Sequence, residues 1–261
     1  MSSAPADKKS ADSVIKTAGR VLEIFEYFRD VRGPLSVREI SERFGYPLSS
    51  TAVLVKSLAT LGYLTYDSDI RSFFPTIRIA MLGDWLYDAM HVGGHLLSLM
   101  EDVCRETGET AMLSIQNDIY SQYVHIMPNR NQVIQLNVPV GTRRLLCWCG
   151  TGWAMLSQQP DETIARLVER TQLRLGKDPI AAKITQEAVA EQVRLVRKNG
   201  YALSNRTVTD GAGTIAMALP VAPNGMRMAI AAGGVADRLL QNRAHIVKVM
   251  AASIKKSQAG Q

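Results

Sequence analysis

The chain has 261 residues, of which 46% are hydrophobic, which indicates a globular protein with one large domain or two ordinary ones. Thirty Lys and Arg against 24 Asp and Glu give a net charge of +6, which permits binding to nucleic acid without requiring it. Charge interrupts every apolar run well short of the ~20 residues that cross a bilayer, and residues 1–12 lack the apolar core of a signal peptide. We therefore expect a cytoplasmic protein without membrane contact, whose three cysteines are reduced thiols.

The first 77 residues predict a tail and a small helical domain. Residues 1–12 are small, charged and without periodicity, which is typical of a disordered tail. Residues 13–77 begin with a helix that ends at Gly33 and Pro34. Apolar residues recur along it at helical spacing, and they are Val14, Ala18, Val21, Leu22, Phe25 and Phe28.

A second and a third helix follow, and then a hairpin. Ser36 and Glu39 have the spacing of a capping box, and Gly45 is a typical helix stop. The third helix starts near residues 48–50, and its expected buried face carries Leu54, Leu58 and Leu61. Residues 63–66 and 71–77 are rich in strand-forming side chains around a turn at Asp67, Ser68 and Asp69. Three helices and a hairpin predict a winged helix-turn-helix over residues 13–77.

Residues 78–107 predict a helical linker. Gly93 and Gly94 lie within it, and each glycine costs a continuous helix ~1 kcal/mol relative to alanine. We therefore expect two shorter helices here and not one long rod.

Residues 108–256 predict a second domain of mixed structure. Strand-like stretches at 111–115 and 120–126 flank Asn117 and Asp118, which is a hairpin signal, and residues 134–138 alternate apolar with polar. Helical patterns follow at 150–157, 161–170 and 185–198. Strands are expected at 214–221 and 226–232, before a last helix that carries Leu239, Ile246, Val247, Met250 and Ile254. This order predicts an α+β fold, an antiparallel sheet with flanking helices.

Four stretches together resemble the IclR-type bacterial transcriptional regulators: LSVREISERFGYPLSSTAVLVKSLATLGYL, FFPTIRIAMLGDWL, LLCWCGTGWAMLS and GYALSNRTVTDGAGTIAMALPVAPNGMRMAIAAGG. The resemblance extends from Ser13 to Ile254. It implies a ligand-responsive regulator of a catabolic operon, with a GAF-like effector-binding domain at residues 108–256. Its implied partners are an operator in double-stranded DNA, a small carboxylate effector and further copies of the chain, as a dimer or tetramer. No cofactor or metal is expected.

The third helix is the expected recognition helix, which enters the major groove with its N-terminal residues. The candidate DNA contacts there are Ser49, Ser50, Thr51, Ala52, Val53 and Lys56. Arg38 and Arg43 on the second helix and Arg71 in the wing are candidate phosphate contacts. As the alternative, Ser49 or Ser50 merely caps the helix and the arginines are solvated. Because few of these side chains read base edges, specificity is expected to depend also on DNA shape and the wing.

The loop before residue 150 predicts an anion site, because glycines allow a sharp turn and the first amides of a helix are unsatisfied. The alternative is a tight turn needed for packing. The resemblance implies that an effector carboxylate meets the backbone at Gly150 and Thr151. It further implies that the same pocket is lined by Ser204, Thr214, Ala231 and Gly233, beside Trp148, which otherwise belongs to the core. Because Ala231 and Gly233 carry no polar side chain, an aromatic or similarly apolar monocarboxylate is the expected effector.

Two other functions remain open at this point. Cys149 precedes a helix, where a thiol pKa is lowered, so it is a candidate nucleophile of an acyl-transfer or hydrolase enzyme with His125 or His91 as base. Cys147 and Cys149 alone are too few ligands for a zinc site. An interaction module with a degenerate DNA-binding helix is the third interpretation.

Overall fold

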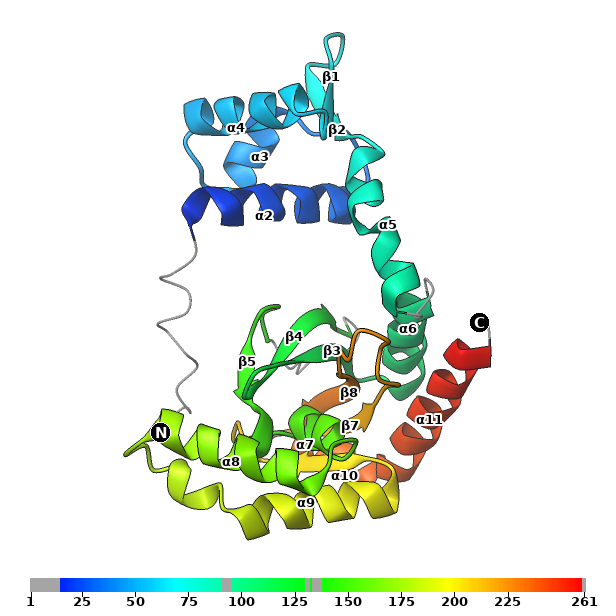
Figure 1. Ribbon diagram of the computed structural model, residues 1–261. Coiled ribbons are helices and arrows are strands. Elements are labelled where there is room, and N and C mark those ends of the chain that lie inside the picture. The colour runs from blue at the N-terminus through cyan, green and yellow to red at the C-terminus, as the bar shows by residue number, and fades with distance from the viewer. Residues whose placement is uncertain (1–14, 91–94, 130–131, 133–137, 260–261) are drawn as a thin grey trace. The chain divides into compact units, whose positions relative to one another are not determined.

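The computed structural model of the protein describes residues 15–90, 95–129, 132 and 138–259 (Figure 1). The predicted tail, Gly93 and Gly94, and most of the predicted strand at 134–138 lie outside these residues. The chain divides into two compact units, with the border between Asp88 and Ala89. No helix among the described residues is long and apolar enough to span a membrane.

The N-terminal unit is the predicted winged helix-turn-helix. Its elements are α2 (Lys16–Val31), α3 (Val37–Phe44), α4 (Leu48–Thr60), the antiparallel hairpin β1 (Leu64–Asp67) and β2 (Ser72–Pro75), and α5 (Arg78–Met90). The capping box is confirmed, because Ser36 accepts from the Glu39 amide and the Glu39 carboxylate accepts from the Ser36 amide. Gly45 ends α3 in the left-handed conformation at φ 65°, which only glycine adopts at no steric cost.

Two apolar residues expected in the core of this unit lie on its surface. Leu22 is 65% exposed and Leu61 is 59% exposed. The buried face of α4 is formed by Thr51, Val55 and Leu58, so Leu61, which caps the helix, falls outside it. The core otherwise follows the predicted periodicity, around Ile24, Phe28, Leu35, Ile40, Val55, Leu58, Leu64 and Phe73.

The C-terminal unit contains a six-stranded sheet in which every neighbouring pair is antiparallel, as predicted, in the order β5-β4-β3-β8-β7-β6. The strands are β3 (Thr110–Asn117), β4 (Tyr120–Met127), β5 (Arg143–Leu145), β6 (Ala202–Asn205), β7 (Ala212–Ala218) and β8 (Met228–Val235). The predicted hairpin at Asn117 and Asp118 joins β3 to β4. Strands β5 and β6 were not predicted, because three and four residues are too few to form a recognisable pattern.

Helices cover both faces of this sheet and enclose one core on each (Figure 1). One face carries the short helices η1 (Leu146–Trp148) and η2 (Ala181–Lys183) with α7 (Gly150–Leu156), α8 (Asp161–Leu175) and α9 (Gln186–Asn199). The other face carries α6 (His95–Thr107), α10 (Ala236–Gln241) and α11 (Arg243–Ala259). The last helix was predicted as one. It is two, because Asn242 leaves helical geometry at ψ 9° and its carbonyl accepts from Ile246 to start α11.

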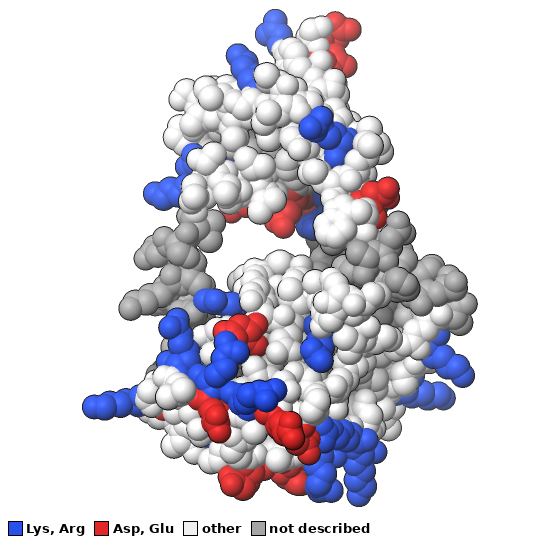
Figure 2. Space-filling view, viewed as in Figure 1, with Lys and Arg blue, Asp and Glu red and all other residues white. Residues whose placement is uncertain are grey.

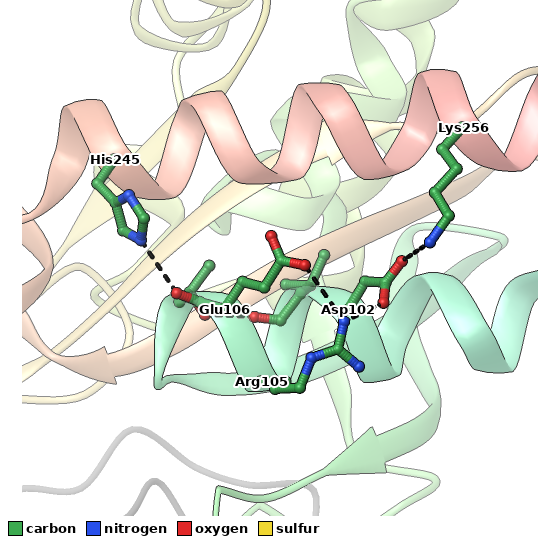
Figure 3. Close-up of polar contacts among 7 residues, drawn as sticks. Asp102, Arg105, Glu106, His245 and Lys256 are labelled. Carbon is green, nitrogen blue, oxygen red and sulfur yellow. Dashed lines mark hydrogen bonds and ion pairs between the residues drawn. The ribbon is translucent and has the colours of Figure 1, made fainter.

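Helices α6 and α11 are joined by polar contacts as well as by their apolar faces (Figure 3). The carboxylate of Asp102, only 8% exposed, accepts from Lys256 Nζ at 2.8 Å and from Arg105 Nη2 at 2.5 Å. These two cations lower the pKa of Asp102. His245 Nε2 lies 3.0 Å from the carbonyl oxygen of Glu106 in the last turn of α6. The contacts anchor the helix that follows the predicted linker glycines to the end of the chain.

A buried ion pair leaves no room for a side chain at residue 234. Glu109 is 2% exposed, and Arg238 Nε and Nη2 donate to its two oxygens at 2.6 and 2.5 Å. A Cβ on Gly234 would lie 2.1 Å from Glu109 Oε2 and 2.9 Å from Arg238 Nη2. Because both oxygens of the carboxylate are already held, it cannot turn aside without losing a bond.

We predict that Gly234→Ala lowers the free energy of unfolding by about 1–3 kcal/mol, because the added methyl overpacks the ion pair. Urea unfolding followed through Trp148 and Trp153, which lie in the same unit, measures this change. Gly83→Ala is the control, since a Cβ there meets no atom within 4 Å. An unchanged midpoint for Gly234→Ala would show that the Glu109 carboxylate is free to move.

Candidate functional site

The surface of α4 presents a mixed set of small and apolar side chains. Ser49, Ser50 and Lys56 are exposed, Ala52 is half-buried, and Val53 is 67% exposed. Neither serine caps the helix, because Pro47 holds the cap position without a side-chain bond, and Ser50 Oγ donates to the Pro47 carbonyl at 3.0 Å. This exposed side of the helix is therefore available to DNA.

Thr51 must be removed from the predicted DNA contacts. Its side chain is 2% exposed and faces the core of the unit, where Oγ1 donates to the Pro47 carbonyl at 3.0 Å. The reason is geometrical: Thr51 lies one turn before Val55 and on the same inward stripe of α4.

The candidate phosphate contacts on the other elements are all exposed. Arg38 donates to Glu42 at 2.7 Å on α3, and Arg43 lies over the ring of Tyr27 at 5.7 Å. Arg71 lies in the turn of the wing with φ 51°, a left-handed conformation. Of the three, Arg38 is the one that already has a carboxylate partner, which makes it the least suited to bind phosphate.

An arginine on α2 that the sequence did not single out lies beside the turn into α4. The guanidinium of Arg20 stacks on the ring of Tyr46 at 4.3 Å from its centroid. The hydroxyl of Tyr46 donates to the Glu23 carboxylate, and burial together with this bond raises the pKa of Tyr46 to about 12. The stack holds a cation close to the start of the predicted recognition helix. The contact joins residues far apart in the sequence, so no local pattern reveals it.

The start of α7 lies on the sheet where β6, β7 and β8 are paired. The register sets Ser204 opposite Thr214, and Thr214 opposite Gly233. Gly150 lies directly above them, since a Cβ there would be 3.2 Å from Ser204 Cβ and 3.6 Å from the Thr214 carbonyl oxygen. The structure thus brings four of the predicted effector residues together.

Ala231 and Trp148 border this group. Ala231 is fully buried in the core cluster that α7 covers, and strand alternation puts it on the same face as Gly233. Trp148 is half-buried, and its indole N–H donates to the Thr207 carbonyl at 3.2 Å. Trp148 therefore packs on the core while it is bonded to the loop after β6.

Thr151 points toward another strand, β4. Its Oγ1 lies 2.8 Å from Ser121 Oγ and 3.5 Å from Cys149 Sγ, and its side chain is 1% exposed. Tyr123, two residues after Ser121 on the same face, hydrogen-bonds Thr151 as well. Sequence reasoning missed Ser121 and Tyr123, although their alternation along one strand marks both as inward-facing.

The two glycines of the Cys149–Trp153 loop have different roles. Cys149 Sγ accepts from the Gly152 amide at 3.3 Å, and the Cys149 carbonyl accepts from the Trp153 amide at 2.9 Å. A Cβ on Gly152 would lie 2.0 Å from the Leu146 carbonyl oxygen, so Gly152 is a packing requirement. The amides of Gly150 and Thr151 stand earlier in the first turn, where no intrahelical acceptor exists.

The expected activation of Cys149 is not observed. The thiol is 3% exposed, and burial raises its pKa despite the bonds from Thr151 and Gly152. Burial likewise raises the pKa of Cys147 to about 11. A buried thiol of raised pKa is a poor nucleophile at neutral pH. Among the described residues, no group of three or more His, Cys, Asp or Glu is placed to hold a metal ion.

Comparison with known families gives two matches. Residues 17–68 match the IclR helix-turn-helix domain, and residues 87–258 match the bacterial transcriptional regulator IclR C-terminal domain. The second match alone covers more than half of the chain.

Curated relatives are transcriptional regulators. The chain is 19% identical to the transcriptional repressor IclR of Escherichia coli K12 over 198 residues, which cover 75% of this chain and 71% of that protein. It is 26% identical to the repressor AllR of Salmonella typhimurium over 236 residues, which cover 86% and 81%.

Solved structures share the fold. The effector domain of the regulator IclR from Acinetobacter sp. ADP1 aligns with a TM-score of 0.59 and 27% identity over 66% of this chain and 98% of that one. An IclR homologue from Microbacterium hydrocarbonoxydans, crystallised with 4-hydroxybenzoate, aligns with a TM-score of 0.55 and 18% identity over 94% of this chain and all of that one. At 18% identity the likeness concerns the fold alone.

Lys56 and Arg71 remain the predicted phosphate contacts. We expect Lys56→Ala and Arg71→Asn each to flatten the slope of log affinity against log salt by ~1 in a DNA titration. Asn is chosen at residue 71 because it tolerates the left-handed backbone. Lys183→Ala, which removes the same charge from η2, should leave the slope unchanged. If all three variants behave alike, the contacts are not local.

Proposed function

The chain belongs to the IclR family of bacterial transcriptional regulators, and we propose that the signal it senses is an aromatic or similarly apolar monocarboxylate. As a member of this family, the protein is a DNA-binding regulator and not an enzyme. The observation that carries the proposal is the position of Gly150, where the first turn of α7 meets Ser204 and Thr214.

The carboxylate is assigned to the first turn of α7. The Gly150 and Thr151 amides have no intrahelical acceptor, and donors of this kind suit an anion. Gly150 lets the backbone approach Ser204 closely, and a larger residue would fill that space. The hydroxyl groups of Ser204 and Thr214 are the proposed polar partners of the effector.

The rest of the effector is assigned an apolar body. Ala231 and Gly233 offer no side-chain donor or acceptor on this face of the sheet, and the hydroxyls of Thr151 and Ser121 are bonded to each other at 2.8 Å. A small oxo-acid needs several polar partners to offset its desolvation, whereas an aromatic ring needs none there. Burial of the ring contributes ~25 cal/mol per Å² of apolar area. The same fold holds 4-hydroxybenzoate in the Microbacterium homologue, which supports this class of ligand.

We further propose that the chain dimerises through its N-terminal unit and the first linker helix. Large apolar side chains are exposed there on α2 and on and just before α5: Ile15 at 75%, Leu22 at 65%, Ile77 at 75%, Met81 at 67%, Leu82 at 57% and Trp85 at 63%. Exposed apolar patches of this kind mark interaction sites. A two-fold dimer would also present two recognition helices to a palindromic operator.

Calorimetry tests the effector assignment. Benzoate-type acids should bind more tightly than glyoxylate or pyruvate, and Gly150→Val and Thr214→Val should each weaken binding at least ~tenfold, or ~1.4 kcal/mol. Thr163→Val is the matched control, because this threonine lies on α8 and bonds only Arg166. DNA binding by each variant reports that it is folded. The proposal fails if glyoxylate binds more tightly, or if both pocket variants keep full affinity.

Sedimentation velocity tests the dimer. The wild-type chain should sediment at twice its 28.7 kDa mass or more, and Trp85→Glu should shift it toward the monomer, because a buried charge opposes association. Val140→Glu, a change at an exposed apolar residue of the other unit, should leave the mass unchanged. A wild-type monomer at micromolar concentration would contradict the proposal.

A further inference from the structure

A hollow of about 580 Å³ lies at the edge of the sheet, beside α8, and it is separate from the pocket assigned to the effector. It is enclosed by the β3–β4 turn, the first residue of β5 and the last two turns of α8. The residues that line it are Asn117, Asp118, Ile119, Tyr120, Arg143, Arg170, Leu173 and Arg174. Its volume lies in the range of small-molecule sites.

The hollow has an excess of positive charge. Three arginines and a single aspartate line it. Figure 2 shows Lys and Arg side chains gathered over the part of the C-terminal unit formed by α8 and its surroundings, with fewer acidic groups among them. The one acid, Asp118, is held by Arg170 Nη2 at 2.5 Å. The remaining charge of the lining is therefore cationic.

The guanidinium groups are held in place by the fold. Arg143 lies over the ring of Tyr120 at 4.8 Å from its centroid, which orients its planar face. Arg170 and Arg174 are one helical turn apart on α8, so they project from the same side of the helix. Like charges at this spacing repel each other, and Arg174 makes no ion pair within the described part of the chain. An anion between the three groups would relieve this repulsion.

The hollow also has apolar walls. Leu173, between the two arginines of α8, is 82% exposed, and the ring of Tyr120 is half-buried. A leucine so exposed at the rim of a charged hollow is available to an apolar part of a ligand. The combination suits a molecule with two anionic groups and a compact apolar body.

We propose that this hollow is a second ligand site, which takes a small organic dianion through Arg143, Arg170 and Arg174. Guanidinium groups bind carboxylate and phosphate oxygens in the same bidentate manner, so either anionic group fits. Asp118 occupies one of the guanidiniums and competes with the ligand. The site does not depend on the identity of the effector at α7.

Titration of the full-length protein with two dianions tests the site. Phthalate and phenyl phosphate, both at pH 8, present two carboxylates or one phosphate on the same ring, and benzyl alcohol is the neutral control. Saturable binding of at least one dianion, without binding of the alcohol, is expected. The tighter of the two identifies the anionic group. Absence of saturable binding by both would overturn the proposal.

Three variants locate the bound dianion. Arg174→Gln should weaken binding at least ~tenfold, the effect of losing one charge-assisted contact. Arg166→Gln, one turn before Arg170 on α8 but outside the lining, should leave the affinity unchanged. Asp118→Asn should tighten binding, because it releases Arg170. Asn is suited to the left-handed backbone of residue 118, at φ 55°, so this variant keeps the turn.

Other occupants give other results. Equal losses in Arg166→Gln and Arg174→Gln would reduce the effect to general surface charge, which overturns the proposal. Loss of dianion binding in Gly150→Val, with Arg174→Gln unaffected, would move the ligand to the α7 pocket. A fall in DNA affinity in Arg174→Gln, without any effect on dianion binding, would assign the arginines to DNA. A gain of affinity in Asp118→Asn is a result that a purely structural role cannot produce.

Discussion

The close approach of the α7 start to the sheet is the constraint on which the C-terminal unit depends. At Gly152 the helix touches the Leu146 carbonyl with no space for a methyl group, and at Gly150 it touches Ser204. Cys149, buried between these contacts, uses its sulfur as the helix cap. The same burial that makes the thiol unreactive holds the first amides of α7 against β6 and β7. A reactive cysteine and this seating of the helix are therefore incompatible.

Polar contacts on the opposite face of the sheet connect this arrangement to the linker. Glu109 follows α6 and is held by Arg238 of α10, directly beneath Gly234 of β8. Asp102 fixes α6 to α11. Because β8 also carries Gly233, a shift of this strand by a ligand at α7 would act on the Glu109 ion pair and hence on α6. The size of any such coupling is set by the difference in effector affinity between the two states of the protein.

Local signals allowed much of this fold to be predicted from the sequence. The Ser36 and Glu39 capping box, the Gly45 stop and the Asn117-Asp118 turn depend on near neighbours, and each has the predicted structure. Strands β5 and β6 exist only because longer strands pair with them, so no periodicity marked them. Thr51 and Leu61 were misplaced because helical spacing gives the period of a buried face but not its exact phase.

The candidate site divides in the same way. Glycines and a helix start predicted where α7 approaches the sheet, since these are local features. The contacts of Thr151 with Ser121 and of Arg20 with Tyr46 are set by tertiary packing, and neither has a pattern in the sequence. The hollow at Arg143 and Arg170 likewise joins β5 to α8, and it became visible only with the fold.

The composition of the recognition helix has a physical consequence for how this regulator finds its operator. Once Thr51 is assigned to the core, the exposed start of α4 offers Leu48, Val53 and two serines, and none of these forms the bidentate base contacts of Arg, Asn or Gln. Apolar side chains can contact thymine methyl groups, but they do not distinguish every base pair. Cations at the edges of the unit, such as Arg20 on its tyrosine and Arg71 in the wing, then fix the position of the helix through the DNA backbone. Specificity in such an interface comes from the shape and deformability of the DNA and from the spacing of two half-sites, which makes an oligomer part of the recognition itself.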